Sequence, residues 1–179
     1  MTPQMYDAQA DSIKVEDIAT NSNNRIVLER IRTNGKGASS NCLYIQNQYD
    51  NLEGEECIDY VPEVVYDMGW LGYFISKCDY LKELYIRDFE PPSGASVLDV
   101  IKPFFSGLTN NKSLNTLNFF GMDLLDGKIF TMLVPFFKHN NNLDVLSLEE
   151  CILGNEGSRL LAMALGTCKK IITKCDATE

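Results

Sequence analysis

The sequence has a single histidine, His139, and neither of two common nucleotide-binding motifs. His139 lies in the polar stretch Lys138–Asn142, KHNNN, where we expect it to be solvated. If His139 is only a solvated residue, the chain has no other histidine for a catalytic triad, a metal site or an acid–base couple. Because G-x-x-x-x-G-K-[ST] and G-x-G-x-x-G are both missing, no phosphate-binding loop of these types is predicted. We therefore expect a non-enzymatic chain that holds no metal and no cofactor.

Long apolar runs and basic stretches are also missing. No window of about 18 apolar residues occurs, which argues against a membrane-spanning helix, and the N-terminus lacks the basic and apolar parts of a secretory signal. The formal net charge is −9. Residues 1–67 hold 12 acidic and 5 basic residues, net −7, against 13 and 11, net −2, in residues 68–179. Without a basic stripe, binding to nucleic acid or to an anionic membrane is not expected.

The cysteines include no C-x-x-C pair. The six are Cys42, Cys57, Cys78, Cys151, Cys168 and Cys175. Three of them, Cys78, Cys151 and Cys168, fall at interior or turn positions of a repeating pattern. This distribution is typical of reduced thiols inside a cytosolic protein. We therefore predict a cytoplasmic location.

The segment Leu143–Leu165, LDVLSLEECILGNEGSRLLAMAL, carries the clearest repeating unit. It opens with the spacing L-x-x-L-x-L, typical of a short strand, and continues through a turn into a leucine-bearing helix. Similar strands open at Leu81 and Leu114, at intervals of 33 and 29 residues, with a weaker candidate at Ile171. Three positions before each opening residue stands a residue suited to a turn. These turn residues are Cys78, Asn111, Asn140 and Cys168. Such units cannot bury their apolar faces alone and must stack on one another.

This pattern resembles the leucine-rich repeat family, in the longer, helix-bearing type named after ribonuclease inhibitor. The resemblance covers Met68 to about Leu165. It rests on Leu143, Leu146, Leu148, Cys151, Leu153, Gly154, Gly157, Leu160, Leu161 and Leu165. It implies an α/β solenoid, a horseshoe arc with a parallel inner sheet and outer helices, with strands near residues 43–45, 84–86, 117–119 and 146–148. In the two preceding repeats, Phe89 and Met122 stand at the position that Cys151 has in the clearest repeat. We expect them to pack inward.

The parts outside the clear repeats are less regular. Residues 1–24 are polar and acidic and are expected to form a flexible leader. Residues 25–179 would form the leucine-rich repeat domain, with about four repeats. Residues 50–67 are an acidic insertion with seven acids and no base, typical of a solvated loop or of a functional one. We expect the single tryptophan, Trp70, to pack against it.

The C-terminal repeat is degenerate. Lys174 and Asp176 occupy its two apolar positions, although a shift by one residue would place Cys175 and Ala177 there instead. A polar last repeat is expected where a solenoid is capped. The same sequence would also be compatible with a piece of a longer array.

The expected binding surface is the concave sheet face, which the resemblance implies is the usual binding face of the family. In each strand the residues between the leucines point to this face. They are Tyr44, Gln46, Glu83, Tyr85, Arg87, Asn118, Phe120, Ser147 and Glu149. Aromatic side chains and arginine are enriched at interface hot spots, although cross-strand packing alone would also account for them.

We therefore predict a protein–protein interaction scaffold whose partner sits over Tyr85, Arg87 and Phe120. The acidic insertion at the rim could steer a basic partner toward this face. An enzyme with its site in residues 50–67 is one alternative, and it would require a deep cleft with converging titratable groups. A structural fragment of a longer array is another.

Overall fold

The computed structural model describes residues 3–35, 40–47, 58–91, 96–124 and 127–166, and the backbone of residues 172–174. Its strands are β1 (Cys42–Ile45), β2 (Ile58–Tyr60), β3 (Glu83–Arg87), β4 (Thr116–Phe120), β5 (Val145–Glu149) and β6 (Ile172–Lys174). Its helices are α1 (Pro3–Gln9), α2 (Val15–Ile18), α3 (Ser22–Arg32), α4 (Val65–Lys77), α5 (Val97–Leu108), α6 (Lys128–His139) and α7 (Gly154–Leu165). Among the described residues, no helix has the length and apolar character needed to cross a membrane.

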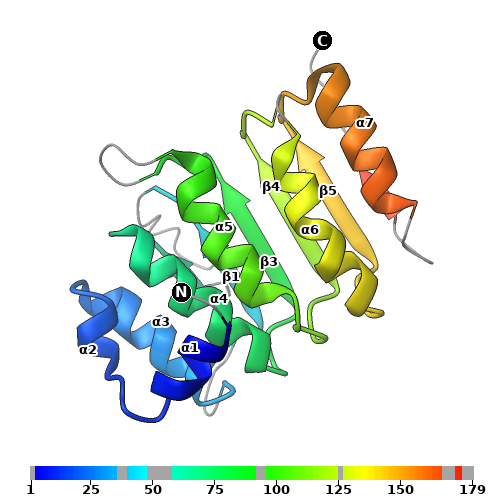
Figure 1. Ribbon diagram of the computed structural model, residues 1–179. Helices are drawn as coiled ribbons and strands as arrows, with labels where there is room; N and C mark the ends of the chain where they lie inside the picture. The colour runs from blue at the N-terminus through cyan, green and yellow to red at the C-terminus, as the bar shows by residue number, and fades with distance from the viewer. Residues whose placement is uncertain are drawn as a thin grey trace.

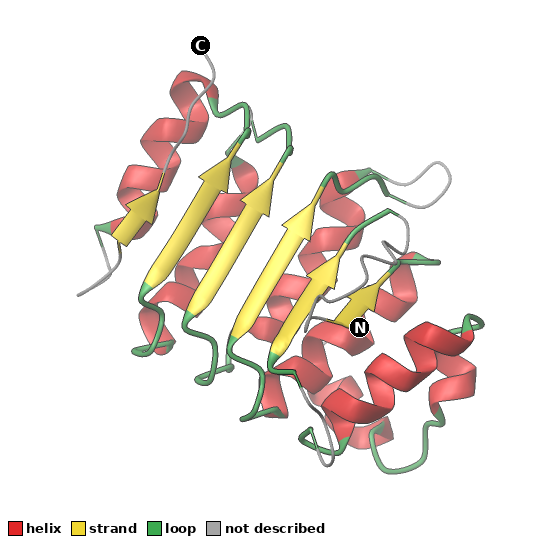
Figure 2. Cartoon of the chain, turned by 180° about the vertical axis from the view of Figure 1, so that it is seen from behind, coloured by secondary structure: helices red, strands yellow, loops and turns green. Residues whose placement is uncertain are grey.

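All six strands run parallel in one sheet, in the order β2-β1-β3-β4-β5-β6. Helices α4 to α7 cover one face of this sheet (Figure 1). Seen from the other side, the strands lie in front and no described helix covers them (Figure 2). We call this uncovered side the open face. The predicted α/β fold with a parallel sheet is confirmed, and strands occupy all four of the expected positions.

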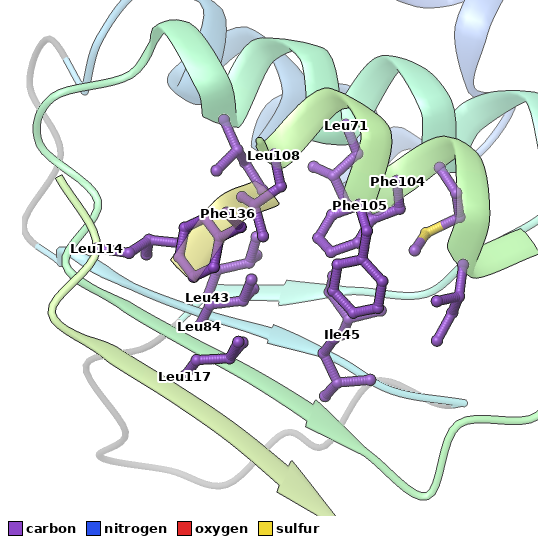
Figure 3. Packing of buried hydrophobic residues seen from close by; sticks show 14 of the residues in the cluster. Leu43, Ile45, Leu71, Leu84, Phe104, Phe105, Leu108, Leu114, Leu117 and Phe136 are labelled. Atoms are coloured by element: carbon purple, nitrogen blue, oxygen red, sulfur yellow. The ribbon is translucent and has the colours of Figure 1, made fainter. Parts of the chain in front are cut away.

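The core lies between the sheet and its helices. Leu43, Leu84, Leu117 and Leu146 occupy equivalent register positions in neighbouring strands, and each is 0% exposed. Because side chains alternate between the faces of a strand, these leucines meet the apolar stripes of the helices. Figure 3 shows Leu43, Leu84 and Leu117 in this layer. Burying each leucine contributes about 1.5–3 kcal/mol, so the L-x-x-L-x-L spacing determines which face of each strand turns inward.

The turns between helices and strands are held by buried asparagines, as the repeat pattern predicted. Asn111 donates to Ile75 O at 2.7 Å in the preceding turn and accepts from Ser113 N and Leu114 N in its own turn. Asn140 similarly donates to Leu114 O at 3.0 Å. Each side chain thereby joins one helix–strand turn to the turn before it.

The third position after the last inward residue of β3, β4 and β5 is apolar or bears a thiol. Phe89 and Met122 are 6% and 3% exposed, so the prediction that they pack inward is confirmed. The Cys151 thiol donates to Phe119 O at 3.4 Å.

The N-terminal residues are not the flexible leader that their composition predicted. Residues 3–24 contain α1, α2 and the start of α3, and they pack against α4. The Tyr6 ring lies edge-on to Trp70, with 4.8 Å between the ring centroids, and the Tyr73 hydroxyl donates to Asp7 at 2.8 Å. Trp70, which is 0% exposed, is therefore covered by α1. It also meets the Tyr66 ring edge-on, with 6.4 Å between the ring centroids, so the predicted contact with residues 50–67 is present beside the unpredicted contact with α1.

The described part of the acidic insertion belongs to the folded domain. Residues 48–57 lie outside the described residues, but Ile58–Tyr60 form β2 at the edge of the sheet. Glu63 accepts from the backbone of Thr20 and Asn21, each at 2.6 Å, and Asp67 Oδ2 accepts from Glu63 N at 2.8 Å. The described part of this segment therefore fastens the N-terminal helices to the sheet and is not a solvated loop.

The last strand, β6, pairs in a register that differs from both of the registers considered from the sequence. Thr173 pairs with Leu146, and Lys174 pairs with Ser147. The sequence had suggested Lys174 or Cys175 opposite Leu146. Register in a parallel sheet is set by neighbouring strands and by burial of one face, and a three-residue strand without leucines carries little of that information.

The cysteines correct one further expectation. Cys42, 5% exposed, is in a disulfide bond. Cys78 and Cys151 are buried thiols, and burial is the main cause that raises the Cys78 pKa. Disulfides persist mainly in oxidising compartments, so the bond at Cys42 does not support the cytoplasmic location, which stays a prediction.

Candidate interaction surface

The nine predicted site residues all come from β1, β3, β4 and β5 or follow them directly, and they lie on the open face. In the register of the sheet, Tyr44, Tyr85, Asn118 and Ser147 form one row across the four strands. A second row, toward the carboxyl ends of the strands, contains Arg87, Phe120 and Glu149. The alternation of leucine and non-leucine positions was therefore sufficient to find the face.

Arg87 stands between two aromatic rings. Its guanidinium carbon lies 5.2 Å from the centroid of the Tyr44 ring and 5.2 Å from that of Phe120. The rings come from β1 and β4, the two strands that flank β3. Such a cation–π arrangement contributes about 0.5–2 kcal/mol, depending on how far the cation is removed from water. The arginine and the two rings therefore form a fixed cluster at the centre of the face, which we call the Arg87 cluster.

Tyr85 connects this cluster to a carboxylate. Its ring lies 4.8 Å from the Tyr44 ring, centroid to centroid, and its hydroxyl donates to Glu83 at 2.8 Å. Burial, and then the hydrogen bond to the Glu83 carboxylate, raise the pKa of Tyr85 above its ordinary value. The phenol is therefore a neutral donor at physiological pH.

Glu149 forms a second fixed carboxylate on the same face. Its Oε1 accepts from Ser147 Oγ at 2.6 Å and from Asn118 Nδ2 at 3.1 Å. Two donors on one oxygen hold the carboxylate above β4 and β5. Glu83 and Glu149 therefore both have partners within the protein.

The face is less exposed than the sequence suggested. Gln46, Asn118 and Ser147 are buried at 5%, 7% and 3% exposure, and the aromatic residues Tyr44, Tyr85 and Phe120 are only partly exposed. Cross-strand packing therefore explains part of their presence. Of the nine predicted residues, those that offer partly exposed surface are the three aromatic residues, Arg87, Glu83 and Glu149.

One residue of the face was missed by the sequence analysis. Asp59 of β2 pairs with Tyr44, and the alternation along the strand places it on the open face, because Tyr60 next to it is 0% exposed. The signal was the apolar–polar–apolar triplet Ile58–Tyr60, which is too short to recognise inside an acidic stretch. With Asp59, Glu83 and Glu149 against Arg87, the described charges of the face are predominantly negative.

Two pockets lie at the helix-to-strand turns, away from the carboxyl ends of the strands. One, of about 370 Å³, is lined by Lys82, Ser113, Asn115, Asn141, Asn142 and Asp144. The other, of about 440 Å³, is lined by Lys112, Lys138, His139, Asn141 and Asn142. His139 is exposed, and its Nδ1 lies 2.7 Å from Pro135 O. In the first pocket, Ser113 Oγ donates to Cys78 O and Lys82 Nζ donates to Asp79 O, each at 2.8 Å, so neither bond joins the hydroxyl to the amine. No group of residues suited to a metal ion occurs within the described part of the chain.

Comparison with known proteins found no family model and no curated protein that matches this chain. The resemblance to leucine-rich repeats therefore rests on the residues of the chain itself.

Proposed function

We propose that this chain is a leucine-rich repeat solenoid of the ribonuclease-inhibitor-like type and serves as a non-enzymatic scaffold that binds a protein partner. The observation that carries this proposal is the open face. It is a parallel sheet surface that no described helix covers, and an arginine and three aromatic rings pack at its centre. These residue types are enriched among the side chains that dominate binding free energy at protein interfaces.

The proposed solenoid is supported by the repetition of local geometry. Strands β3, β4 and β5 are each followed by a residue with positive φ: Asp88 at 43°, Gly121 at 66° and Glu150 at 53°. Non-glycine residues adopt this conformation at some cost. Three equivalent turns, together with the aligned leucines and the asparagine bonds between turns, favour one supersecondary unit stacked on itself.

The mixed charge of the open face favours a protein partner over a polyanion. Arg87 lies among Asp59, Glu83 and Glu149, and the chain has a formal net charge of −9. Binding to a nucleic-acid backbone requires neutralisation of several phosphates by basic side chains. A folded protein or peptide can instead match single charges of both signs.

The proposal is tested by quantitative affinity capture with three forms of the full chain. The wild type is compared with Tyr85→Ala/Phe120→Ala, which removes two rings from the open face. The matched control is Tyr66→Ala/Met163→Ala, because these side chains, 39% and 60% exposed, lie on the helix side of the molecule. Circular dichroism and thermal unfolding establish that each variant is folded.

We expect the open-face variant to lose the captured proteins and the control to retain them. If both folded variants retain every partner, the open face is not the binding surface.

Neutralisation of Asp50, Glu53, Glu55 and Glu56 to the corresponding amides tests the acidic insertion separately. Loss of the partner in that variant alone would place the site in the insertion. A deletion of residues 50–67 is unsuitable because it removes β2 and Asp67.

A further inference from the structure

We propose that Arg87 recognises a single carboxylate on the partner, within a segment of the partner that is otherwise neutral or basic. This inference rests on the proposed binding function of the open face and specifies the chemistry at its centre. The Arg87 cluster consists of Arg87, Tyr44 and Phe120, as described above.

Within the described part of the chain, the guanidinium donors of Arg87 have no acceptor. Among the described residues, Arg87 makes contacts with the two rings, and no hydrogen bond or ion pair joins its nitrogens to an acceptor. Other arginines of the chain have acceptors. Arg25 Nε donates to Ala19 O at 3.0 Å, and Arg159 binds Glu156 through two nitrogens at 2.8 and 2.6 Å. Arg87 is therefore a partly buried cation whose hydrogen-bonding capacity is available.

The two rings hold this cation in a defined orientation. Rings on both sides restrict the rotamers of a long side chain, so less conformational entropy remains to be lost when a ligand binds. The guanidinium carbon lies over both rings, and these contacts use none of its N–H groups in a hydrogen bond. Planar guanidinium edges match the two oxygens of a carboxylate in a bidentate pair. The arrangement therefore suits a carboxylate better than a carbonyl or a hydroxyl.

The neighbouring carboxylates do not satisfy Arg87. Glu83 accepts from the Tyr85 hydroxyl, and Glu149 accepts from Asn118 and Ser147. Phe120 stands between Arg87 and Glu149 in the register of the sheet, so two strand spacings, roughly 10 Å, separate the positions of these two residues.

These carboxylates also limit the charge of the ligand. A phosphate dianion at Arg87 would be repelled by Glu83, Glu149 and the net charge of the chain, and only one arginine would offset it. A monoanionic carboxylate meets half of that repulsion. If basic side chains flank it in the partner, Glu149 and Asp59 attract them.

The first experiment follows the arginine Nε–H signals of the full chain by NMR at constant ionic strength. Sodium acetate is the probe, acetamide is its neutral control, and inorganic phosphate tests the other anion class. We expect acetate to shift the Arg87 signal with saturation in the millimolar range, and we expect Arg25 and Arg159 to serve as internal references with little change. An Arg87 signal that does not respond to acetate, or that responds more strongly to phosphate, overturns the proposal.

The second experiment selects peptides from a random displayed library against the wild-type chain. We expect selected peptides to contain an aspartate, a glutamate or a terminal carboxylate. Their affinity should fall about 10- to 100-fold for Arg87→Gln, because a charge-assisted hydrogen-bonded pair is lost, and Arg87→Lys should restore only part of it. Thermal unfolding shows whether the variants remain folded.

The outcomes separate this inference from the proposed function. Peptides that lose binding to Tyr85→Ala/Phe120→Ala but bind Arg87→Gln as well as wild type would refute the role of Arg87 and leave the open face as the binding surface. Peptides that bind all of these variants equally would refute both.

Discussion

Replacement of Asn111 by alanine should destabilise the fold more than any other single asparagine change in the helix–strand turns. Asn111 is 0% exposed and lies at the junction of two repeats. Its Nδ2 donates to Ile75 O at 2.7 Å and to Ser113 Oγ at 2.9 Å, and its Oδ1 accepts from Ser113 N at 3.0 Å and Leu114 N at 2.9 Å. Alanine leaves the backbone N–H groups of Ser113 and Leu114 buried without these acceptors, whereas Ile75 O keeps its hydrogen bond from Cys78 N at 3.1 Å.

The magnitude follows from the cost of leaving buried polar groups unpaired. Each such group costs about 1–3 kcal/mol, and entry of a water molecule would offset part of the sum. We expect the free energy of unfolding to fall by about 2–5 kcal/mol. For a chain of this length, each kcal/mol corresponds to a shift of roughly 2–4 °C in the melting temperature, so a value of about 3 kcal/mol predicts a decrease of roughly 6–12 °C.

Urea unfolding followed by circular dichroism measures this difference, with Asn141→Ala as the matched control. Asn141 belongs to the corresponding turn of the next repeat but is exposed, and surface substitutions usually change stability by less than about 0.5 kcal/mol. Equal stability losses for the two variants, or a loss below about 1 kcal/mol for Asn111→Ala, would refute the assignment of the turn bonds as a main link between repeats.

A buried acid, a helix contact and the N-terminal helix lead to further measurable effects. Burial raises the pKa of Asp67 to about 6, so between about pH 4 and 6 the folded chain holds a proton that the unfolded chain releases, and stability falls as pH rises. Asp67→Asn should remove this slope and gain up to about 3 kcal/mol at pH 7, since each pKa unit corresponds to roughly 1.4 kcal/mol; parallel pH–stability curves for the two proteins would contradict it. Gly107→Ala should cost about 1–2 kcal/mol in urea unfolding, because its Cβ would lie 2.5 Å from the backbone of α4, and overpacking outweighs the gain in helix propensity. Gly166→Ala, with its nearest atom at 3.4 Å, should be close to neutral, and a similar result for both glycines would count against tight packing of α4 and α5. Tyr6→Ala should expose Trp70 and increase acrylamide quenching of its fluorescence, whereas unchanged quenching would show that α1 does not cover this ring.

The repeating strands were predictable because their information is local. In β3, β4 and β5 the leucine spacing places one face inward, and the turn residue three positions before each opening leucine marks where the preceding helix ends. Both signals lie within about 30 residues and recur. An uncertain strand position in one repeat can therefore be assigned by comparison with the other repeats. The same alternation identified the open face, since every residue between two inward leucines must point outward.

The N-terminal third could not be predicted in the same way. Residues 3–24 have too few apolar residues to show helical periodicity, and their order depends on Tyr6 packing against Trp70 and on Glu63 binding the backbone of Thr20 and Asn21. These contacts join segments more than 40 residues apart. Strand β2 has the same origin, because three residues become a strand only when β1 offers an edge to pair with.

The sequence by itself determined the leucine face, the turn asparagines and the set of residues on the open face, because these follow from spacing along one chain segment. Only the tertiary structure decided that Arg87 lies between Tyr44 and Phe120, because the three residues belong to three different strands and meet through the register of the sheet. It also decided that Glu83 and Glu149 have hydrogen-bond donors on this face, whereas the guanidinium of Arg87 has no acceptor among the residues that the structure describes. Charge and residue type are properties of the sequence, but which donors remain unpaired depends on neighbours that folding brings together.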